Sequence, residues 1–186
     1  YAYDPNNNRM NMRDWLGGTS WEYDPLNRVT GQNDPFDRGL AYSYDAASNR
    51  TAMTYPDGNR VTYTYSPNNW MDSVTIPDGL TKTYQRDRVG NILLIENPNS
   101  TETDLTYDRV YRVLSLVNRQ TSGGAKLNSA FDYTYNEVGH VTQAVKEYGW
   151  RNPPVVTETY TYDGLRRLIG TEIDPIKNNG EKEFLS

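Results

Sequence analysis

The sequence predicts an all-β protein built from tandem β-hairpins, and three observations support this fold class. A motif of two aromatic residues, two positions apart and followed by Asp or a close analogue, recurs along the chain. The composition is that of strands and turns, with 16 Tyr beside 3 Phe, 14 Gly and 10 Pro. Hydrophobic residues make up only 35% and form no long run. The thick aliphatic core of an α/β enzyme is therefore not expected.

The aromatic motif occurs in eight copies at nearly constant spacing. Its third position falls at residues 3, 23, 44, 65, 86, 107, 135 and 162, so the steps are 20, 21, 21, 21, 21, 28 and 27 residues. A period of this length is the signature of a repeat array, in which each unit packs on its neighbours. The copies are Tyr1-Ala2-Tyr3-Asp4, Trp21-Glu22-Tyr23-Asp24, Tyr42-Ser43-Tyr44-Asp45, Tyr63-Thr64-Tyr65-Ser66, Tyr84-Gln85-Arg86-Asp87, Leu105-Thr106-Tyr107-Asp108, Tyr133-Thr134-Tyr135-Asn136 and Tyr160-Thr161-Tyr162-Asp163.

Within each unit, the order of residue types predicts a strand, a turn and a second strand. Residues two apart share one face of a strand, so the aromatic pair lies on one face and the residue between them on the other. The Asp that follows can accept a hydrogen bond from the backbone two residues on, and Pro, Asn or Gly continues the turn. A basic or polar residue then precedes an apolar one, as in Arg28-Val29. Each unit is therefore predicted to form a β-hairpin.

A second turn links each hairpin to the next. It is clearest at Tyr55-Pro56-Asp57-Gly58 and Ile76-Pro77-Asp78-Gly79, where Pro fixes φ and Gly accepts a positive φ. The two long steps fall where this linking loop is longer, at residues 121–126 and 148–154. The resulting repeats span approximately residues 1–19, 20–39, 40–59, 60–80, 81–101, 102–129, 130–156 and 157–186.

Eight hairpins give about sixteen antiparallel strands. Open twisted sheets rarely exceed about ten strands without curling or splitting. Because every repeat carries the same aromatic stripe, we predict one curved, spiralling sheet with a Tyr-lined face.

The recurrent residues are interpreted as structural. The turn Asp occupies the same place in every unit, which favours a turn-forming role over a metal-binding or acid–base role. The Arg residues are expected to stack on Tyr rings or to pair with the turn Asp of a neighbouring repeat. A basic, aromatic groove for sugars or peptide stays open as the alternative. The predicted structural residues are Tyr1, Tyr3, Asp4, Arg9, Trp21, Tyr23, Asp24, Arg28, Tyr42, Tyr44, Asp45, Arg50, Tyr63, Tyr65, Tyr84, Asp87, Tyr107, Asp108, Arg112, Tyr133, Tyr135, Gly139, Tyr160, Tyr162, Asp163 and Arg167, with Pro56, Asp57, Gly58, Pro77, Asp78 and Gly79 in the linking turns.

Charge and composition narrow the classes of function. The net charge is −5 and the sequence pI about 4.9, so neither nucleic acid nor an anionic membrane is an expected partner. No stretch approaches the roughly 20 apolar residues of a membrane span. With no Cys and a single histidine, His140, a zinc site is not expected. No nucleophile motif or phosphate-binding loop is present. We therefore predict a protein that is not an enzyme and has no cofactor or metal.

The motif resembles the YD-repeat, or Rhs (recombination hot spot), family, whose unit is close to YxYDxxGRLTxxxxPDG, over essentially the whole chain. The resemblance implies a spiral of β-hairpins that encloses a hollow shell. In bacterial polymorphic toxins and insecticidal toxin complexes, such shells hold a toxic C-terminal domain. In animal teneurins, the related shell is part of an adhesion receptor.

The chain departs from the family pattern in two respects. Family shells contain many more than eight repeats, and the shell-borne aspartyl protease that cuts off the cargo is not recognisable here. The repeats begin and end in mid-unit, so we expect an arc cut from a longer protein. Glu172-Ile173-Asp174-Pro175 is predicted to form a further linking turn, and residues 179–184 to begin the next hairpin.

Two functions are consistent with these features. The first is a structural scaffold, part of a shell that encloses a polypeptide cargo in a secreted bacterial protein. The alternative is an extracellular adhesion or carbohydrate-binding module that uses exposed rings as sugar platforms, such as Trp15, Trp21, Trp70 and Trp150. Rings packed between repeats favour the scaffold, and solvent-exposed rings favour binding. Other expected partners are neighbouring repeats of the same parent chain or, through open sheet edges, further copies. The expected location is secreted or at the cell surface.

Overall fold

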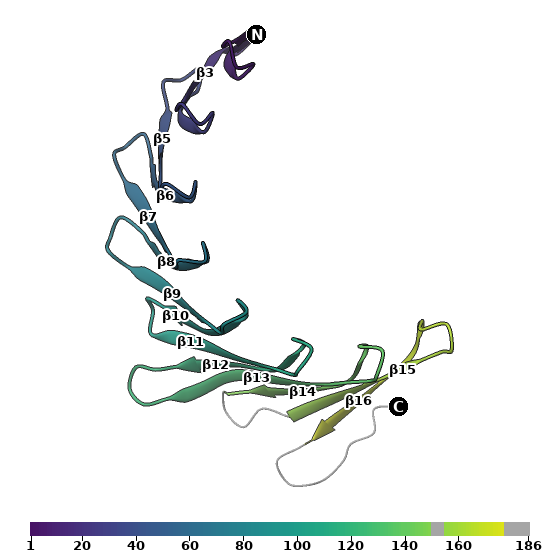
Figure 1. Ribbon diagram of the computed structural model, residues 1–186. Helices are drawn as coiled ribbons and strands as arrows, with labels where there is room; N and C mark the ends of the chain where they lie inside the picture. Colours follow the sequence, from purple (N-terminus) through teal and green to yellow (C-terminus); the bar gives the residue numbers. More distant parts are fainter. Residues whose placement is uncertain (150–154, 177–186) are drawn as a thin grey trace. The chain divides into compact units, whose positions relative to one another are not determined.

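The computed structural model describes residues 1–149 and 155–176, which form sixteen strands. The strand order in the sheet is the order in the chain, and every described pairing is antiparallel (Figure 1). The predicted all-β fold class of about sixteen antiparallel strands is thereby confirmed. None of the described residues belongs to a helix that could cross a membrane. The chain divides into two compact units, Tyr1–Thr83 and Tyr84–Ser186, which are described one at a time.

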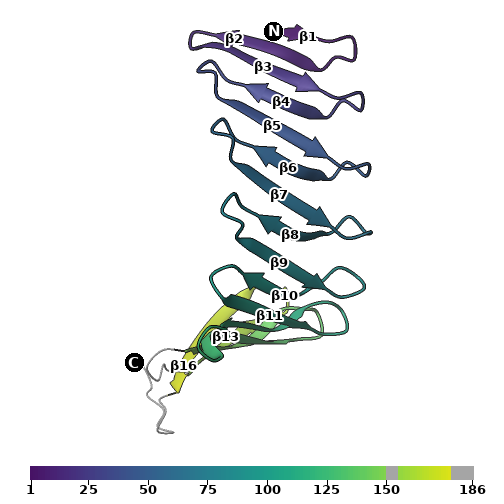
Figure 2. The same ribbon diagram turned by 90° about the vertical axis from the view of Figure 1, so that its left-hand side faces the viewer.

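The first unit contains eight strands and the start of a ninth. Figure 2 shows them running back and forth, so that turns alternate between the two ends of the strands. The pairing register shifts by one residue beside the second aromatic residue of each motif, at Tyr3, Tyr23, Tyr44 and Tyr65. The strands are β1 (Ala2–Tyr3), β2 (Arg9–Asp14), β3 (Gly17–Tyr23), β4 (Val29–Asn33), β5 (Gly39–Tyr44), β6 (Arg50–Thr54), β7 (Arg60–Tyr65), β8 (Met71–Thr75) and β9 (Thr81–Arg86).

The second unit continues the same alternation with longer strands. The register again shifts beside the second aromatic residue, at Tyr107, Tyr135 and Tyr162. The strands are β10 (Ile92–Asn97), β11 (Thr101–Tyr107), β12 (Val113–Gln120), β13 (Lys126–Tyr135), β14 (Val141–Tyr148), β15 (Val155–Tyr162) and β16 (Leu168–Ile176).

One predicted turn is wrong. Residues 172–175 do not form a linking turn but continue β16, in which Glu172 pairs with Thr159 and Asp174 with Thr157. The preceding strand, β15, is long enough to pair with the whole of this segment. Tertiary pairing therefore overrides the turn preference of Asp-Pro. The hairpin predicted at residues 179–184 lies outside the described residues.

The two faces of the first unit differ in chemistry. Directly opposed residues of neighbouring strands share a face, so Tyr42, Met53 and Val61 form a row of large apolar side chains. The alternate row, on the other face, consists of small residues such as Ala52 and Thr62. One face is therefore aromatic and apolar, and the other carries mainly small and hydroxyl side chains.

Very few side chains are buried. Among the described residues the buried ones are Thr19, Ala52, Val61, Ala130 and Ala144. Within each unit, strands contact only the strands next to them in sequence. Since the described residues place no second layer over the sheet of either unit, the hydrogen-bonded ladder and the side chains that join neighbouring repeats must supply much of the stabilisation.

Candidate functional site

The turn inside each hairpin, here called the YD turn, has one backbone geometry throughout. At Asp24–Arg28, the backbone N–H of Asp24 donates to the Arg28 carbonyl at 3.0 Å, and that of Asn27 donates to the Asp24 carbonyl at 2.9 Å. Asn27 has a φ of 61°. This is a three-residue hairpin loop, a type I turn followed by a left-handed residue that forms a bulge. YD turns with the same pair of backbone hydrogen bonds begin at Asp4, Asp24, Asp45, Ser66, Asp87, Asp108, Asn136 and Asp163.

The carboxylate of the turn Asp holds this loop closed. Oδ1 of Asp24 accepts the backbone N–H groups of Leu26, at 2.9 Å, and Arg28, at 3.0 Å. Its Oδ2 accepts the Nε–H of Arg28 at 2.6 Å. The backbone hydrogen bond from Arg28 is the largest of the interactions that lower the pKa of Asp24. Asp4, Asp45, Asp87, Asp108 and Asp163 likewise use Oδ1 for the backbone and Oδ2 for the side chain of the fifth turn residue.

The Arg residues of the motif form two sets. Arg28, Arg112 and Arg167 occupy the fifth turn position and pair with the Asp of their own turn. Arg9 and Arg50 lie one position later, because Asn8 and Asn49 take the fifth position and donate Nδ2–H to the turn Asp. An Asn side chain satisfies Oδ2 without adding charge, so the turn tolerates either residue.

Two of the fifth-position residues, Arg28 and Arg112, also reach the next repeat. Nη1 of Arg28 donates to the backbone carbonyl of Asp45 at 2.9 Å, and its guanidinium lies 4.7 Å from the ring centre of Tyr44. Arg112 repeats this arrangement, 3.1 Å from the Asn136 carbonyl and 4.6 Å from the Tyr135 ring. The neighbouring turn therefore contributes a carbonyl and an aromatic ring, not the carboxylate that the sequence suggested. The later set stacks on first aromatic residues, with Arg9 over Trp21 at 4.1 Å and Arg50 over Tyr63 at 5.1 Å.

The second aromatic residue completes the joint between repeats. The Tyr44 hydroxyl donates to the carbonyl of Val29, 2.8 Å away at the start of the returning strand of the preceding repeat. Burial raises the pKa of three tyrosines in this position, Tyr65, Tyr107 and Tyr135. The same bond, at 2.7–3.0 Å, joins Tyr23 to Arg9, Tyr65 to Arg50, Tyr107 to Ile92, Tyr135 to Val113 and Tyr162 to Val141. We use the name Asp–Arg–Tyr joint for the contacts that connect the turn Asp and fifth-position Arg of one repeat with the second aromatic Tyr of the next, as in Asp24, Arg28 and Tyr44.

Comparison with known proteins agrees with this geometry. Residues 23–60 and 44–81 match the model of the RHS Repeat family. Residues 23–81 therefore contain RHS repeats. The resemblance to the YD/Rhs family is thereby confirmed. No curated protein matches the chain in sequence.

Solved structures with the same fold are toxin assemblies. A crystal structure of TcdB2-TccC3-Cdc42 is 16% identical over 90% of this chain, with a TM-score of 0.73. One of TcdB2-TccC3-TEV is 20% identical over 87%, with a TM-score of 0.71. The Photorhabdus luminescens Tc holotoxin pore with a mutated TccC3 is 19% identical over 87%, with a TM-score of 0.69. The chain spans 9–10% of these chains. At these identities, the likeness shows the fold.

Two repeats vary the joint. His140 takes the fifth turn position, donates its backbone N–H to Oδ1 of Asn136 at 2.9 Å, and places its ring 4.6 Å from Tyr162. Its Nδ1 is buried and has no hydrogen-bond partner among the described residues. Arg86 takes the place of a second aromatic residue and donates from Nη1 to the carbonyl of Gly90, in its own turn.

Linking turns such as Tyr55–Asn59 and Ile76–Leu80 adopt the same backbone by other means. In Tyr55–Asn59, the Tyr55 N–H donates to the Asn59 carbonyl at 2.8 Å, and Gly58 has a φ of 82°. The predicted Pro56, Asp57, Gly58, Pro77, Asp78 and Gly79 all lie in exposed turns of this kind. Sequence reasoning missed the turn Asp34–Arg38, which uses the Asp and Arg chemistry of a YD turn at a linking position. The Asp-x-x-x-Arg spacing could have revealed it.

Exposed rings occur both in the repeat motif and outside it. Tyr1 and Tyr3 of the first motif and Tyr111 in a YD turn are exposed. Trp15 is 90% exposed at the turn between β2 and β3, and Phe36 is 62% exposed in a linking turn. Trp21 is half-buried under Arg9, and Trp70 is also half-buried. Trp150, another predicted sugar platform, lies outside the described residues. The described residues hold no group of three or more His, Cys, Asp or Glu that could bind a metal ion.

Proposed function

We propose that this chain is a structural scaffold, a length of wall from a YD/Rhs shell that encloses a polypeptide cargo such as a C-terminal toxin domain in a secreted bacterial protein. The observation that supports this most is the Asp–Arg–Tyr joint. It occupies the recurrent aromatic and basic side chains in contacts between neighbouring repeats, as at Arg28 with Tyr44. In this role, the chain performs no reaction and needs no cofactor.

A shell wall with few buried side chains must be stabilised by contacts between its repeats, and the joints provide such contacts. Each joint fixes one hairpin to the next through a hydrogen bond to a backbone carbonyl, which does not depend on the identity of the side chain at that position. The wall can therefore vary in sequence on its faces while its repeats remain connected. Both faces remain free to contact solvent or cargo.

A second candidate, an adhesion or carbohydrate-binding module, is favoured by one observation, the 90% exposure of Trp15. An exposed indole is a suitable platform for a sugar ring. A glycan-array screen of the chain, compared with its Trp15→Ala variant, tests this function. Binding that disappears in the variant would favour the adhesion role over the scaffold.

The scaffold is tested by protease protection in the polypeptide that carries these repeats and the segment downstream of them. The downstream segment is expected to resist a protease that digests the same segment when it is produced alone. A variant with weakened joints, Tyr44→Phe combined with Tyr135→Phe, should lose part of this protection. Tyr55→Phe serves as the control, since the Tyr55 ring lies in a linking turn. Equal digestion rates of the enclosed and isolated segments would refute enclosure.

A further inference from the structure

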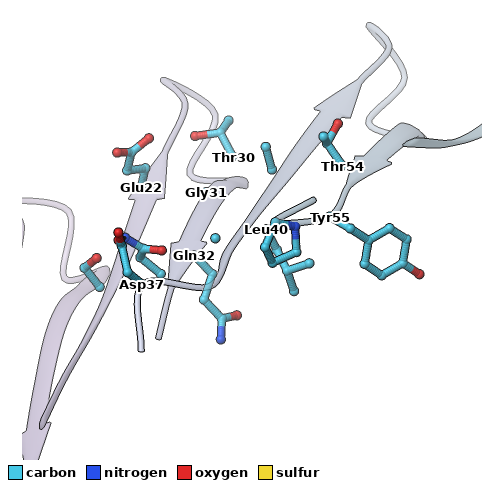
Figure 3. A pocket seen from close by; sticks show the side chains of 13 residues that line it. Glu22, Thr30, Gly31, Gln32, Asp37, Leu40, Thr54 and Tyr55 are labelled. Carbon is cyan, nitrogen blue, oxygen red and sulfur yellow. The ribbon is translucent and has the colours of Figure 1, made fainter. Parts of the chain in front are cut away.

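A hollow of about 440 Å³ lies on the small-residue face of the first unit, above β3 to β6. Its floor is the row in which Gly31 and Ala41 pair side by side, with Gly39 nearby in β5. The same row continues to Glu22 in β3 and to Thr54 in β6. Figure 3 shows Glu22 and Thr54 projecting from flanking strands to the same side of the sheet. The volume falls within the range of about 300–1,000 Å³ usual for ligand sites.

The hollow exists because this pair of strands carries smaller residues than the equivalent pairs. Where Gly31 faces Ala41, the next two repeats have Ala52 facing Thr62 and Ser73 facing Thr83. Where Asn33 faces Gly39, the next two have Thr54 facing Arg60 and Thr75 facing Thr81. Residues with side chains thus stand at the positions of Gly31 and Gly39 in those repeats. The glycine floor is therefore a feature of this pair of strands and does not recur in the next two repeats.

Acceptor oxygens overhang the glycine floor. A Cβ placed on Gly31 would lie 3.1 Å from Oε2 of Glu22, and one placed on Gly39 would lie 3.1 Å from Oδ1 of Asn33. Asn33 donates its Nδ2–H to Oδ1 of Asp37 at 3.0 Å. This bond orients the amide so that its oxygen faces the floor. A carboxylate oxygen thus lies over Gly31, and an amide oxygen lies over Gly39.

The charge of the lining is negative. Glu22 and Asp37 contribute carboxylates, and no lining residue is cationic. Arg38, the nearest basic residue in sequence, is paired with Asp34 at 2.6 Å and stacked on Phe36 at 5.1 Å. Arg60 stands opposite Thr54 on the next strand but does not line the hollow. A ligand that fits this lining donates hydrogen bonds and carries positive charge.

We propose that this hollow binds the guanidinium or ammonium group of an Arg or Lys side chain from a polypeptide lying along this face of the sheet. The inference rests on the proposed function for the source of that polypeptide, since an enclosed cargo would present such side chains. The site is open to solvent, which screens the attraction between charges. Its affinity for a single side chain is therefore expected to be weak, with a Kd on the order of 1 mM.

The test uses N-acetyl-L-arginine amide, an Arg side chain on a neutral backbone, titrated into the isotope-labelled chain and followed by NMR. Saturable shifts are expected at the backbone amides of Gly31 and Gly39. N-acetyl-L-glutamine amide, which lacks the positive charge, should produce much smaller shifts. Shifts that do not saturate, or that are equal for the two compounds, would overturn the proposal.

Two variants locate the site. Glu22→Gln is expected to weaken binding by about 3- to 10-fold, as for the loss of a charge-assisted hydrogen bond at a solvent-exposed position. Gly39→Thr places in the floor the residue that Thr81 supplies in a later repeat. It should weaken binding similarly, with the same or greater resistance to urea, because Gly is unfavourable in a strand. Glu137→Gln, an equal charge change in an exposed turn of the other unit, is the matched control. Unchanged affinity in both Glu22→Gln and Gly39→Thr would refute the site.

The result of the arginine amide titration can be distinguished from the result of the protease-protection experiment that tests the proposed function. If the arginine amide fails to bind while the downstream segment stays protected from protease, the hollow is no site and enclosure stands. If the amide binds but the downstream segment is not protected, the hollow is a site for basic side chains of another source.

Discussion

Two turns of the first unit, Asp24–Arg28 and Tyr55–Asn59, have the same backbone path but are held in different ways. Both close with the same two backbone hydrogen bonds, and both put the fourth residue in the left-handed region, at φ 61° for Asn27 and 82° for Gly58. In the first turn, a carboxylate binds two backbone N–H groups and an Arg that reaches the next repeat. In the second, Pro56 and Gly58 favour the conformation, and Asp57 accepts hydrogen bonds from Asn59 of the same turn.

The difference separates local from collective stabilisation. A Pro-Asp-Gly turn is stable because of the intrinsic preferences of its residues and closes one connection. The YD turn closes its connection and also ties its hairpin to the following one through Arg28 and Tyr44. Substitutions in YD turns should therefore destabilise several hairpins, whereas substitutions in linking turns should have local effects.

The largest expected effect comes from removing the turn carboxylate. Asp24→Ala leaves two backbone N–H groups and the Nε–H of Arg28 without their acceptor, and should lower the urea midpoint well below that of the unsubstituted chain. Asp57→Ala, in the linking turn, should cost less than about 1 kcal/mol, because Asp57 bonds only to Asn59 of the same turn. Urea denaturation followed by circular dichroism measures both. Equal losses would remove the distinction between the turns.

Loss of a single hydroxyl should have an intermediate effect. Tyr44→Phe deletes the bond to the Val29 carbonyl and is expected to cost about 1 kcal/mol. Tyr55→Phe removes the same atom from a ring that is 39% exposed in a linking turn, and should change stability by less than about 0.5 kcal/mol. Hydrogen exchange of the amides in β4 and β5 provides a local measurement. No difference between the two variants would contradict the role of the hydroxyl.

Replacing Arg by Lys should distinguish an Arg that joins repeats from one that does not. Arg28→Lys keeps the charge but loses the planar guanidinium that contacts Asp24, the Asp45 carbonyl and Tyr44, with an expected cost of about 0.5–1.5 kcal/mol. Arg38 pairs only within its own turn and its side chain is 65% exposed, so Arg38→Lys should cost less than about 0.5 kcal/mol. The shift in the urea midpoint is measured for each variant. Equal shifts for Arg28→Lys and Arg38→Lys would contradict the distinction between the two Arg residues.

The smallest expected effect is the pH dependence of the YD turns. The backbone hydrogen bond from Arg28 lowers the pKa of Asp24 below its ordinary value of 3.8, and that from Arg167 does so for Asp163. For Asp45, the hydrogen bond from the Asn49 side chain is the largest interaction that lowers the pKa. A carboxyl whose pKa is lowered by folding stabilises the fold above its unfolded pKa, and this stabilisation is lost as the pH falls through the folded value. Above pH about 5, the urea midpoint should therefore not depend on these groups. As the pH drops below 3.8, the urea midpoint should decrease. Asp24→Asn, which keeps an acceptor oxygen but no charge, should show a shallower fall.

The sequence predicted the hairpins because each local signal agreed with the next. The alternating aromatic residues, the turn Asp and the Pro-Asp-Gly links all specify short-range geometry, and the spacing of 21 residues specifies their repetition. The joints could not be predicted in the same way. The acceptor of the Tyr44 hydroxyl is a backbone carbonyl, which every residue type has, so the sequence does not indicate which residue provides it. The position of this carbonyl depends on the strand register.

The errors of prediction have related causes. Arg9 and Arg28 look equivalent in the sequence, but hydrogen bonding to the turn Asp assigns the fifth position to Asn8 in one case and to Arg28 in the other. Asp174-Pro175 carries a turn signal, yet β15 extends far enough to pair with it. The hollow above Gly31 and Gly39 depends on which glycines face the same side, which again requires the register.

The most direct test of the joint is a double-mutant cycle between Arg28 and Tyr44, the two side chains that meet across neighbouring repeats. Arg28→Met and Tyr44→Leu are made singly and together, and the free energies of unfolding are compared. The structure predicts a coupling energy of about 1 kcal/mol, within the range for a cation over an aromatic face. The matched pair Arg38→Met and Tyr55→Leu should show no coupling. A coupling energy near zero for Arg28 and Tyr44 would contradict the account.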